Sequence, residues 1–180
     1  LTHSRDGRHW SRPRQRQPFI PVGAAESWDA DYLGPARPGP VLVGDELWFY
    51  YYGHRSTERN KSVKWSFNSG LAKLRRDGFA SLNAGEKPGQ VITRPMTFKG
   101  RSLFINADVA EGGWVEAAVL TSDSKSVSGY TLEEAIPLTK DTTKGAMSWK
   151  ARKQLDSPGD EHVRLLFQLK NAKLYSFWIE

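Results

Sequence analysis

Four side chains within one short polar segment could perform chemistry together: Glu26, Trp28, Asp29 and Asp31. Two carboxylates can donate and accept protons at a reacting bond, and an indole ring can stack on the apolar face of a sugar. Asp29, which directly follows the ring, is the first candidate for a catalytic residue, and Glu26 is the second. Trp28 and Asp31 would then contact the substrate. The alternative is that Asx turns order this loop, with Trp28 packed over a neighbouring strand.

A second candidate pair, His54 and Arg55, ends an aromatic stretch of the chain. His54 could hydrogen-bond a sugar or hold a carboxylate, and Arg55 could bind an acidic substrate. The alternative is an exposed strand end with no such role. The remaining histidines have no metal-ligand spacing with one another or with a carboxylate pair: His3, His9 and His162. We therefore expect neither a metal site nor another cofactor.

The element that positions these residues is a predicted hairpin from Pro40 to His54. Val41–Val43 is an apolar, largely β-branched strand, Gly44-Asp45 is a turn, and Leu47–Tyr52 is a second, strongly aromatic strand. Bulky residues in a row without polar gaps at helical spacing exclude an amphipathic surface helix, so we expect this second strand to be covered on both faces. Its tyrosines are expected to pack in the sheet rather than to bind sugar.

Two segments with the same pattern, each centred on an Asp-Gly turn, flank this hairpin. Leu1–Arg12 and Leu71–Leu82 have Asp6-Gly7 and Asp77-Gly78 at their centres, and Asp-Gly between two extended segments predicts a hairpin. We interpret both aspartates as turn residues. The repeat indicates blades of a β-propeller, with the tight turns on one edge and the long loops on the other. The candidate residues lie in or beside the long loops, where binding sites are usually found.

The second half of the chain predicts a different architecture. Its short alternating segments are typical of a β-sandwich of the jelly-roll type. The expected strands are Gln90–Arg94, Ser102–Ala107, Trp114–Thr121, Ala146–Trp149, Val163–Leu169 and Lys173–Ile179. Asn171-Ala172 is expected to join the last two as a hairpin. The chain is therefore predicted to be all-β, with a terminal propeller blade segment in residues 1–83 and a β-sandwich in residues 84–180.

The charge distribution narrows the range of partners. The net charge is +6, from 26 Lys and Arg against 20 Asp and Glu, and much of the excess lies in Arg5, Arg8, Arg12, Arg14 and Arg16. This cluster could attract an acidic polysaccharide, or it could be a solvated arm. The sequence has no RNP-type motif, zinc spacing or helix-turn-helix pattern, which argues against nucleic acid. Without cysteine there is no disulfide or thiol nucleophile, and without a run of 18 apolar residues no membrane span is predicted.

Several stretches of the sequence, taken in order, resemble one family. They are SRDGRHWSR, ESWD, DELWFYYYGH and GLAKLRRDGFASL, followed by ITRPMTFKGRSLFINAD and VRLLFQLKNAKLYSFW. Together they resemble the C-terminal part of five-bladed β-propeller glycoside hydrolases of the invertase, levanase and arabinanase type. In the invertase-like members of that family, a β-sandwich follows the last blade.

The resemblance implies cleavage of glycosidic bonds in oligo- or polysaccharides by a pair of acids, about 5 to 5.5 Å apart for retention or about 6.5 to 9.5 Å apart for inversion. Such families keep their nucleophile or base in N-terminal blades. We therefore expect this chain to lack the full active site, and to associate with the missing blades or with a second copy. The resemblance also implies a secreted or periplasmic protein.

Three questions stay open at this point. The Arg-Asp-Pro and Glu-Cys motifs of invertases are absent, so the sugar, the linkage and the stereochemistry are not fixed. Two alternatives to an enzyme portion also remain. One is a non-catalytic carbohydrate-binding module, suited by the arginine cluster to an acidic polysaccharide, and the other is a structural accessory domain.

Overall fold

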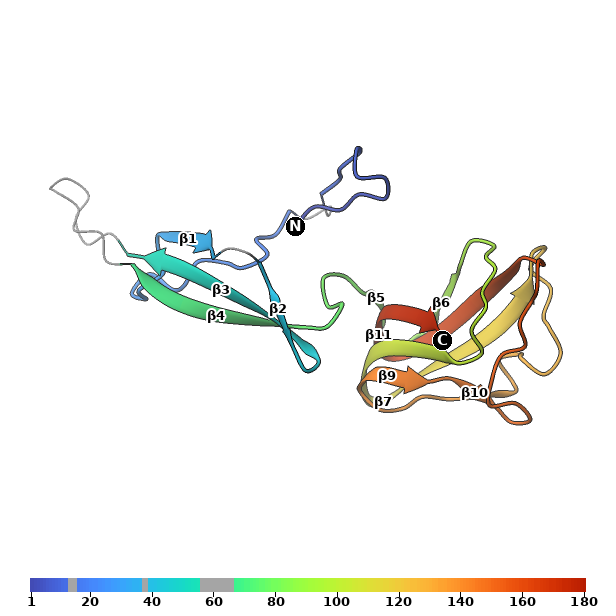
Figure 1. Cartoon of the computed structure of the whole chain (residues 1–180). Coiled ribbons are helices and arrows are strands. Elements are labelled where there is room, and N and C mark those ends of the chain that lie inside the picture. Colours follow the sequence, from blue (N-terminus) through green and yellow to red (C-terminus); the bar gives the residue numbers. More distant parts are fainter. Residues whose placement is uncertain (13–15, 37–38, 56–66) are drawn as a thin grey trace, which may run out of the picture. The chain divides into compact units, whose positions relative to one another are not determined.

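The computed structural model describes residues 1–12, 16–36, 39–55 and 67–180 (Figure 1). These residues form strands and turns and no helix, so the all-β prediction is confirmed. The chain divides into two compact units, which we call the N-terminal unit, Leu1–Leu74, and the C-terminal unit, Arg75–Glu180. This division falls before the boundary predicted near Ala84.

The N-terminal unit contains one open antiparallel sheet. Its strands are β1 (Tyr32–Pro35), β2 (Val41–Val43), β3 (Glu46–His54) and β4 (Asn68–Arg75), and β3 pairs with all three others (Figure 1). The predicted hairpin is confirmed, because β2 and β3 pair from Val41 opposite Trp48 to Val43 opposite Glu46. Gly44 makes the turn with a φ of 59°, a conformation that glycine adopts without a steric cost.

The expectation that β3 is covered on both faces is wrong for the described chain. The Tyr50 and Tyr52 side chains are 48% and 39% exposed, and every residue of β2 is exposed. Within the described residues, the Phe19 and Trp28 rings pack on Phe49 and Tyr51 of this sheet but leave Tyr50 and Tyr52 exposed. The rings of Tyr51 and Tyr52 lie across neighbouring strands, where a Cβ atom on Gly34 would collide with the Tyr52 ring and one on Gly70 with the Tyr51 ring.

The two Asp-Gly turns have different surroundings. At Asp6-Gly7 the chain reverses as predicted, and the flanking segments meet in a single bridge between His3 and Ser11. At Asp77-Gly78 the predicted hairpin is wrong. The strand that follows this turn, β5 (Leu82–Ala84), does not pair with β4. It pairs with Ala172–Leu174 of β11, in the C-terminal unit.

The sheet of the C-terminal unit is built on two long antiparallel strands, β7 (Leu103–Thr121) and β11 (Val163–Ile179). β11 also pairs with β5 and with β6 (Gly89–Ile92), and β7 pairs with β9 (Thr142–Ala146). A separate two-stranded sheet pairs β8 (Ala135–Ile136) with β10 (Ser148–Trp149). Figure 1 shows β7 and β11 as the longest arrows of this unit.

The predicted division of these long strands is wrong. Segments expected to be separate are continuous in both β7 and β11, and the expected Asn171-Ala172 hairpin is a bulge inside β11. Asn171 has a φ of 44°, and the register shifts between Lys170 and Ala172 and again between Leu174 and Ser176. At the first shift Asn171 lies opposite residues 110–113 of β7, and at the second Tyr175 is a single extra residue of β11. Each shift changes which residues of β11 point inward.

The apolar pattern of β11 follows these bulges. Leu165, Phe167 and Leu169 face the core before the first bulge, Ala172 and Leu174 face it between the bulges, and Phe177 packs against it after the second. The alternation that predicted two strands therefore belongs to one strand, in which the inward-facing positions shift by one residue at each bulge. The bulges keep large apolar side chains on the inner face along the whole length of β11.

The hydrophobic core of the described chain lies entirely in the C-terminal unit. Its largest fully buried apolar side chains are Phe167, Leu103, Ile105, Leu155, Leu165 and Val115. Trp149 is 2% exposed and donates its indole N–H to the Ala117 carbonyl at 2.9 Å. Trp149 is therefore a core residue.

Arg75 anchors the start of the C-terminal unit. Its guanidinium donates to the Asn106 Oδ1 at 2.6 Å and to backbone carbonyls on β7 and β9, and it binds Asp141 at 2.7 Å. Asn106 is fully buried and donates in turn to the Arg76 carbonyl at 2.7 Å. Because a buried amide without partners is costly, this network fixes the chain at Arg75 and explains why the unit begins before Ala84.

Candidate functional site

The loop that carries the predicted catalytic residues packs against the end of β3. The Asp31 N–H donates to the His54 carbonyl at 3.3 Å, and the Gly23 N–H donates to the Asp29 carbonyl at 3.2 Å. Gly53 on β3 lies so close that a Cβ atom there would be 2.9 Å from the Asp29 Cβ. The structure therefore brings the two predicted groups, the acidic loop and the end of the aromatic strand, into one site.

Asp29 is the buried carboxylate of this site, with 9% of its surface exposed. Ser27 Oγ donates to Oδ1, and the Tyr51 hydroxyl donates to Oδ2 at 3.0 Å. The Ser27 hydrogen bond is the main cause that lowers the pKa of Asp29, with a smaller contribution from Tyr51, and together they outweigh the effect of burial. Asp29 is consequently ionised at neutral pH, which suits a base or a nucleophile and does not suit a proton donor.

Trp28 and Tyr51 form the aromatic part of the site. Their rings are stacked, with centroids 5.7 Å apart and an interplanar angle of 12°. Burial is the main cause that raises the pKa of Tyr51, and the neighbouring Asp29 raises it further, so the phenol keeps its proton and remains a donor. The Trp28 side chain is still 36% exposed, which leaves part of the indole available to a ligand.

The second carboxylate, Glu26, has a different environment. Its Oε2 lies 2.8 Å from Arg55 Nη2, and its side chain is 85% exposed whereas that of Arg55 is 37% exposed. Arg55 Nη1 also donates to the Glu26 carbonyl at 3.4 Å. Exposed ion pairs of this kind contribute little to stability, so both groups can exchange this contact for one with a polar ligand.

His54 is packed between rings rather than exposed at a strand end. Its side chain is 6% exposed, its ring stacks on Tyr32 with centroids 5.4 Å apart, and the Phe67 ring meets it edge-on at 5.3 Å. Asp31, by contrast, has an exposed side chain. Of the predicted substrate-binding residues, Trp28, Arg55 and Asp31 thus reach the surface, while His54 supports them from inside.

The sequence did not identify two residues that organise this site, Ser27 and Tyr51. Both hold the Asp29 carboxylate, and Tyr51 also supports Trp28. The only signal for Tyr51 is the alternation of β3, which places it on the same face as Gly53, two residues further on. For Ser27 the signal is its position two residues before an aspartate, a common spacing for local side-chain hydrogen bonds in turns.

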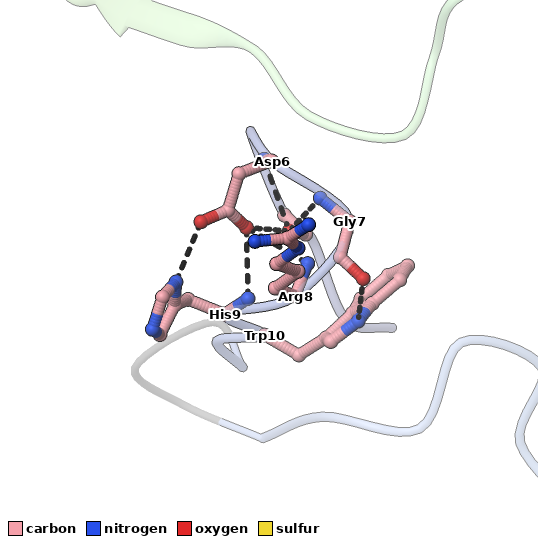
Figure 2. Close-up of polar contacts among 6 residues, drawn as sticks. Asp6, Gly7, Arg8, His9 and Trp10 are labelled. Carbon is pink, nitrogen blue, oxygen red and sulfur yellow. Dashed lines mark hydrogen bonds and ion pairs between the residues drawn. The ribbon is translucent and has the colours of Figure 1, made fainter.

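A separate polar cluster surrounds Asp6 (Figure 2). Its Oδ1 accepts hydrogen bonds from the Arg8 and His9 N–H groups at 2.9 and 2.8 Å, and its Oδ2 lies 2.5 Å from His9 Nδ1. The His9 side chain is the main cause that lowers the pKa of Asp6. Trp10 donates its indole N–H to the Gly7 carbonyl at 3.1 Å, as Figure 2 shows. These contacts confirm that Asp6 is a turn residue.

The remaining predictions concern charge and metals. The described arginines of the N-terminal cluster are exposed, whereas Arg14 lies outside the described residues, as does the segment 56–66 of the long loop after Arg55. Within the described parts of the chain, no three His, Asp or Glu side chains come close enough together to hold a metal ion. The same parts contain no helix of the length and apolarity needed to cross a membrane.

Comparison with known proteins gives no relative. No protein-family model, no curated protein and no solved structure matches the chain.

Proposed function

We propose that the chain is the C-terminal portion of a glycoside-hydrolase-like protein and that it contributes a carbohydrate-contacting surface centred on Trp28. In this proposal the N-terminal unit is a propeller blade and the C-terminal unit is a β-sandwich. The sequence resemblance supports this assignment. An antiparallel sheet, such as that of the N-terminal unit, is also what a propeller blade is built from; here β1 and β2 pair with successive parts of β3, residues 51–54 and 46–48, and β4 pairs with β3 as well.

The observation that carries the proposal is the stacked Trp28–Tyr51 pair beside two charged groups. Parallel rings 5.7 Å apart hold the indole in one orientation, so a ligand need not order it on binding. Arg55 and Glu26 supply donors and acceptors next to it, and their exposed ion pair can open toward sugar hydroxyls. A flat apolar surface with polar groups at its edge is the chemistry that a pyranose or furanose ring requires.

Asp29 has a defined place in this proposal. Because Ser27 and Tyr51 keep it ionised, Asp29 can act as the base or nucleophile of a carboxylate pair, but it cannot protonate a leaving group at neutral pH. The proton donor of the pair is then Glu26 or an acid from another part of the protein. The described residues alone support binding better than turnover.

Affinity gel electrophoresis with a panel of neutral and acidic polysaccharides tests the surface. We expect at least one polysaccharide to retard the chain, and Trp28→Ala to weaken that binding about tenfold, as for an aromatic anchor at the centre of an interface. The matched control is Trp10→Ala, which removes an indole that is 63% exposed in the same unit and should leave mobility unchanged. Equal losses in both variants, or no retardation by any polysaccharide, would exclude the Trp28 surface.

A second candidate, binding to an acidic polysaccharide, is favoured by the exposed arginines near the N-terminus. Here Trp28→Ala should have little effect, while replacing Arg5, Arg8 and Arg12 with serine should abolish retardation. Binding should also weaken when the ionic strength rises, because exposed charges are screened. The two candidates are thus distinguished by which set of variants loses binding.

A further inference from the structure

The C-terminal unit contains a cleft of about 620 Å³ that the proposed function does not use. It lies beside the ends of β7 and β11, where Thr121 pairs with Val163 and the loop Asp156–His162 leads into β11. The volume is within the usual range for sites that take small organic molecules, about 300 to 1,000 Å³. The cleft therefore has the size of a ligand site.

The floor of this cleft is apolar and firmly held. It includes Val119, Leu155 and Tyr130, which are 6%, 1% and 4% exposed and belong to the hydrophobic core. The Tyr130 ring also packs edge-on against Trp149, with centroids 5.0 Å apart. Phe98 and Val127 extend the apolar lining toward the surface. Because these side chains are fixed by core packing, the cleft offers a preformed apolar surface.

The rim of the cleft carries negative charge. Its lining includes Asp156, Asp160 and Glu161 but neither lysine nor arginine, on a chain whose net charge is +6. Asp156 binds Arg152. Among the described residues, the side chains of Asp160 and Glu161 have no hydrogen bond or ion pair. Two exposed carboxylates at the mouth of the cleft are therefore available to a cation.

The arginines near the cleft do not compete for these two carboxylates. Arg152 donates to the Tyr130 hydroxyl at 3.2 Å and binds Asp156. Arg164 donates to the Ser122 and Thr93 carbonyls at 3.0 and 3.1 Å. Both guanidinium groups are thus directed at protein oxygen atoms. The carboxylates are not a metal site either, since no three such groups in the described chain lie together closely enough.

We propose that this cleft binds a small organic cation, an ammonium group attached to an aromatic or branched apolar body. The apolar body would lie on Val119, Leu155 and Tyr130, and the ammonium group would face Asp160 and Glu161. A neutral sugar fits the cleft less well, because the buried part of the lining is apolar and would leave its hydroxyl groups without partners. This site is independent of the surface around Trp28.

The test is an NMR titration of the whole ¹⁵N-labelled chain of 180 residues at pH 7.5 with 2-phenylethylamine, whose amine is protonated at that pH. We expect saturable shifts confined to the amides around Val119, Val127 and Tyr130, with a Kd of about 1 mM or below for a ligand of this size. The neutral analogue 2-phenylethanol should bind about tenfold more weakly. Raising the salt concentration should weaken binding of the amine and leave that of the alcohol unchanged.

Two double variants distinguish the effect of the charges in the cleft from a general effect on the protein. Asp160→Asn with Glu161→Gln changes two exposed side chains and should raise the Kd of the amine about fivefold, in the range expected for exposed charge pairs. Glu86→Gln with Glu111→Gln makes the same charge change at exposed positions outside the cleft and should not alter it. Equal affinities for amine and alcohol, equal effects of both double variants, or shifts centred elsewhere would overturn the proposal.

Discussion

The two units of this protein differ in how much apolar surface they bury. In the C-terminal unit, β7 and β11 direct alternating apolar side chains into a core where Phe167, Leu165 and Ile105 are at most 1% exposed. In the N-terminal unit the buried polar groups are Asp29 and His54, and none of its described residues joins that core. The aromatic strand that dominates the sequence thus lies in the unit with less burial. Aromatic content alone does not show where a core forms.

The open sheet has consequences for partners. Val41, Leu42 and Val43 are 47%, 51% and 40% exposed on β2, and Tyr50 and Tyr52 on β3 are similarly exposed. Exposed apolar side chains gathered on one sheet are typical of a surface that another chain or domain covers. This pattern is compatible with the sequence-based expectation that the chain associates with further propeller blades or with a second copy.

The difference in burial between the two units is tested most strongly by replacing one phenylalanine with alanine in each unit. Phe167→Ala should lower the free energy of unfolding of the C-terminal unit by about 3 to 5 kcal/mol, because it leaves a cavity in a closed core. Phe49→Ala, at a half-buried ring that meets Phe19 edge-on at 5.3 Å, should cost the N-terminal unit only about 1 kcal/mol. Urea denaturation followed by resolved NMR signals of each unit measures both values.

Similar losses of unfolding free energy in Phe167→Ala and Phe49→Ala would contradict the difference in burial between the two units. They would mean that the sheet of the N-terminal unit is covered in solution, as it would be in a dimer. Repeating the Phe49→Ala measurement at several protein concentrations identifies that case, because stability conferred by association depends on concentration.

The sequence predicted local structure better than strand connections. The β2–β3 hairpin was predictable because Gly44-Asp45 and the flanking apolar runs act within a few residues. The bulge at Asn171 was not, since a change of alternation phase can mark either a hairpin or a bulge. The choice is made by β7, which pairs with β11 on both sides of Asn171 and lies far away in sequence.

For the candidate site, too, the sequence predicted residues better than contacts between segments that are distant along the chain. Glu26, Trp28 and Asp29 could be recognised by residue type, and the predicted order of strands placed their loop and the end of the aromatic strand on the same edge. The sequence could not show that Asp29 is held by Ser27 and Tyr51, because that depends on how the loop closes over Gly53. The pKa of Asp29, and with it the role that this carboxylate can have, follows from those contacts.

The buried carboxylate predicts an acid-sensitive N-terminal unit. The pKa of Asp29 is lowered, so its stabilising effect is present above the ordinary aspartate pKa and is lost as the pH falls through the lower value in the folded state. As the pH falls below the ordinary aspartate pKa of about 4, we expect the Trp28 indole signal in NMR spectra to move toward its unfolded position before signals of the C-terminal core change. Asp29→Asn should remove this pH dependence and loosen the loop at pH 6.

Tyr51→Phe is the graded control for Asp29. It removes the 3.0 Å hydrogen bond while keeping a ring under Trp28, so its effect should lie between those of the wild type and Asp29→Asn. If the acid response of Trp28 persists in Asp29→Asn, another carboxylate controls the loop. Glu26 would then be the next candidate, through its ion pair with Arg55.

The smallest expected effect concerns Glu116 on β7, opposite Gln168 of β11. Burial is the main cause that raises the pKa of Glu116, and the charge of Glu133 adds to it. A carboxyl whose pKa is raised on folding destabilises the folded state once the pH exceeds that pKa, so Glu116→Gln should stabilise the C-terminal unit at pH 7 by about 0.5 kcal/mol or less. Urea denaturation at pH 7 and pH 4 should show the gain shrinking at the lower pH, where Glu116 is increasingly protonated. A loss of stability at pH 7 would instead show that the ionised group has a favourable partner, and that polar contacts support the C-terminal unit in the way that they support the site around Asp29.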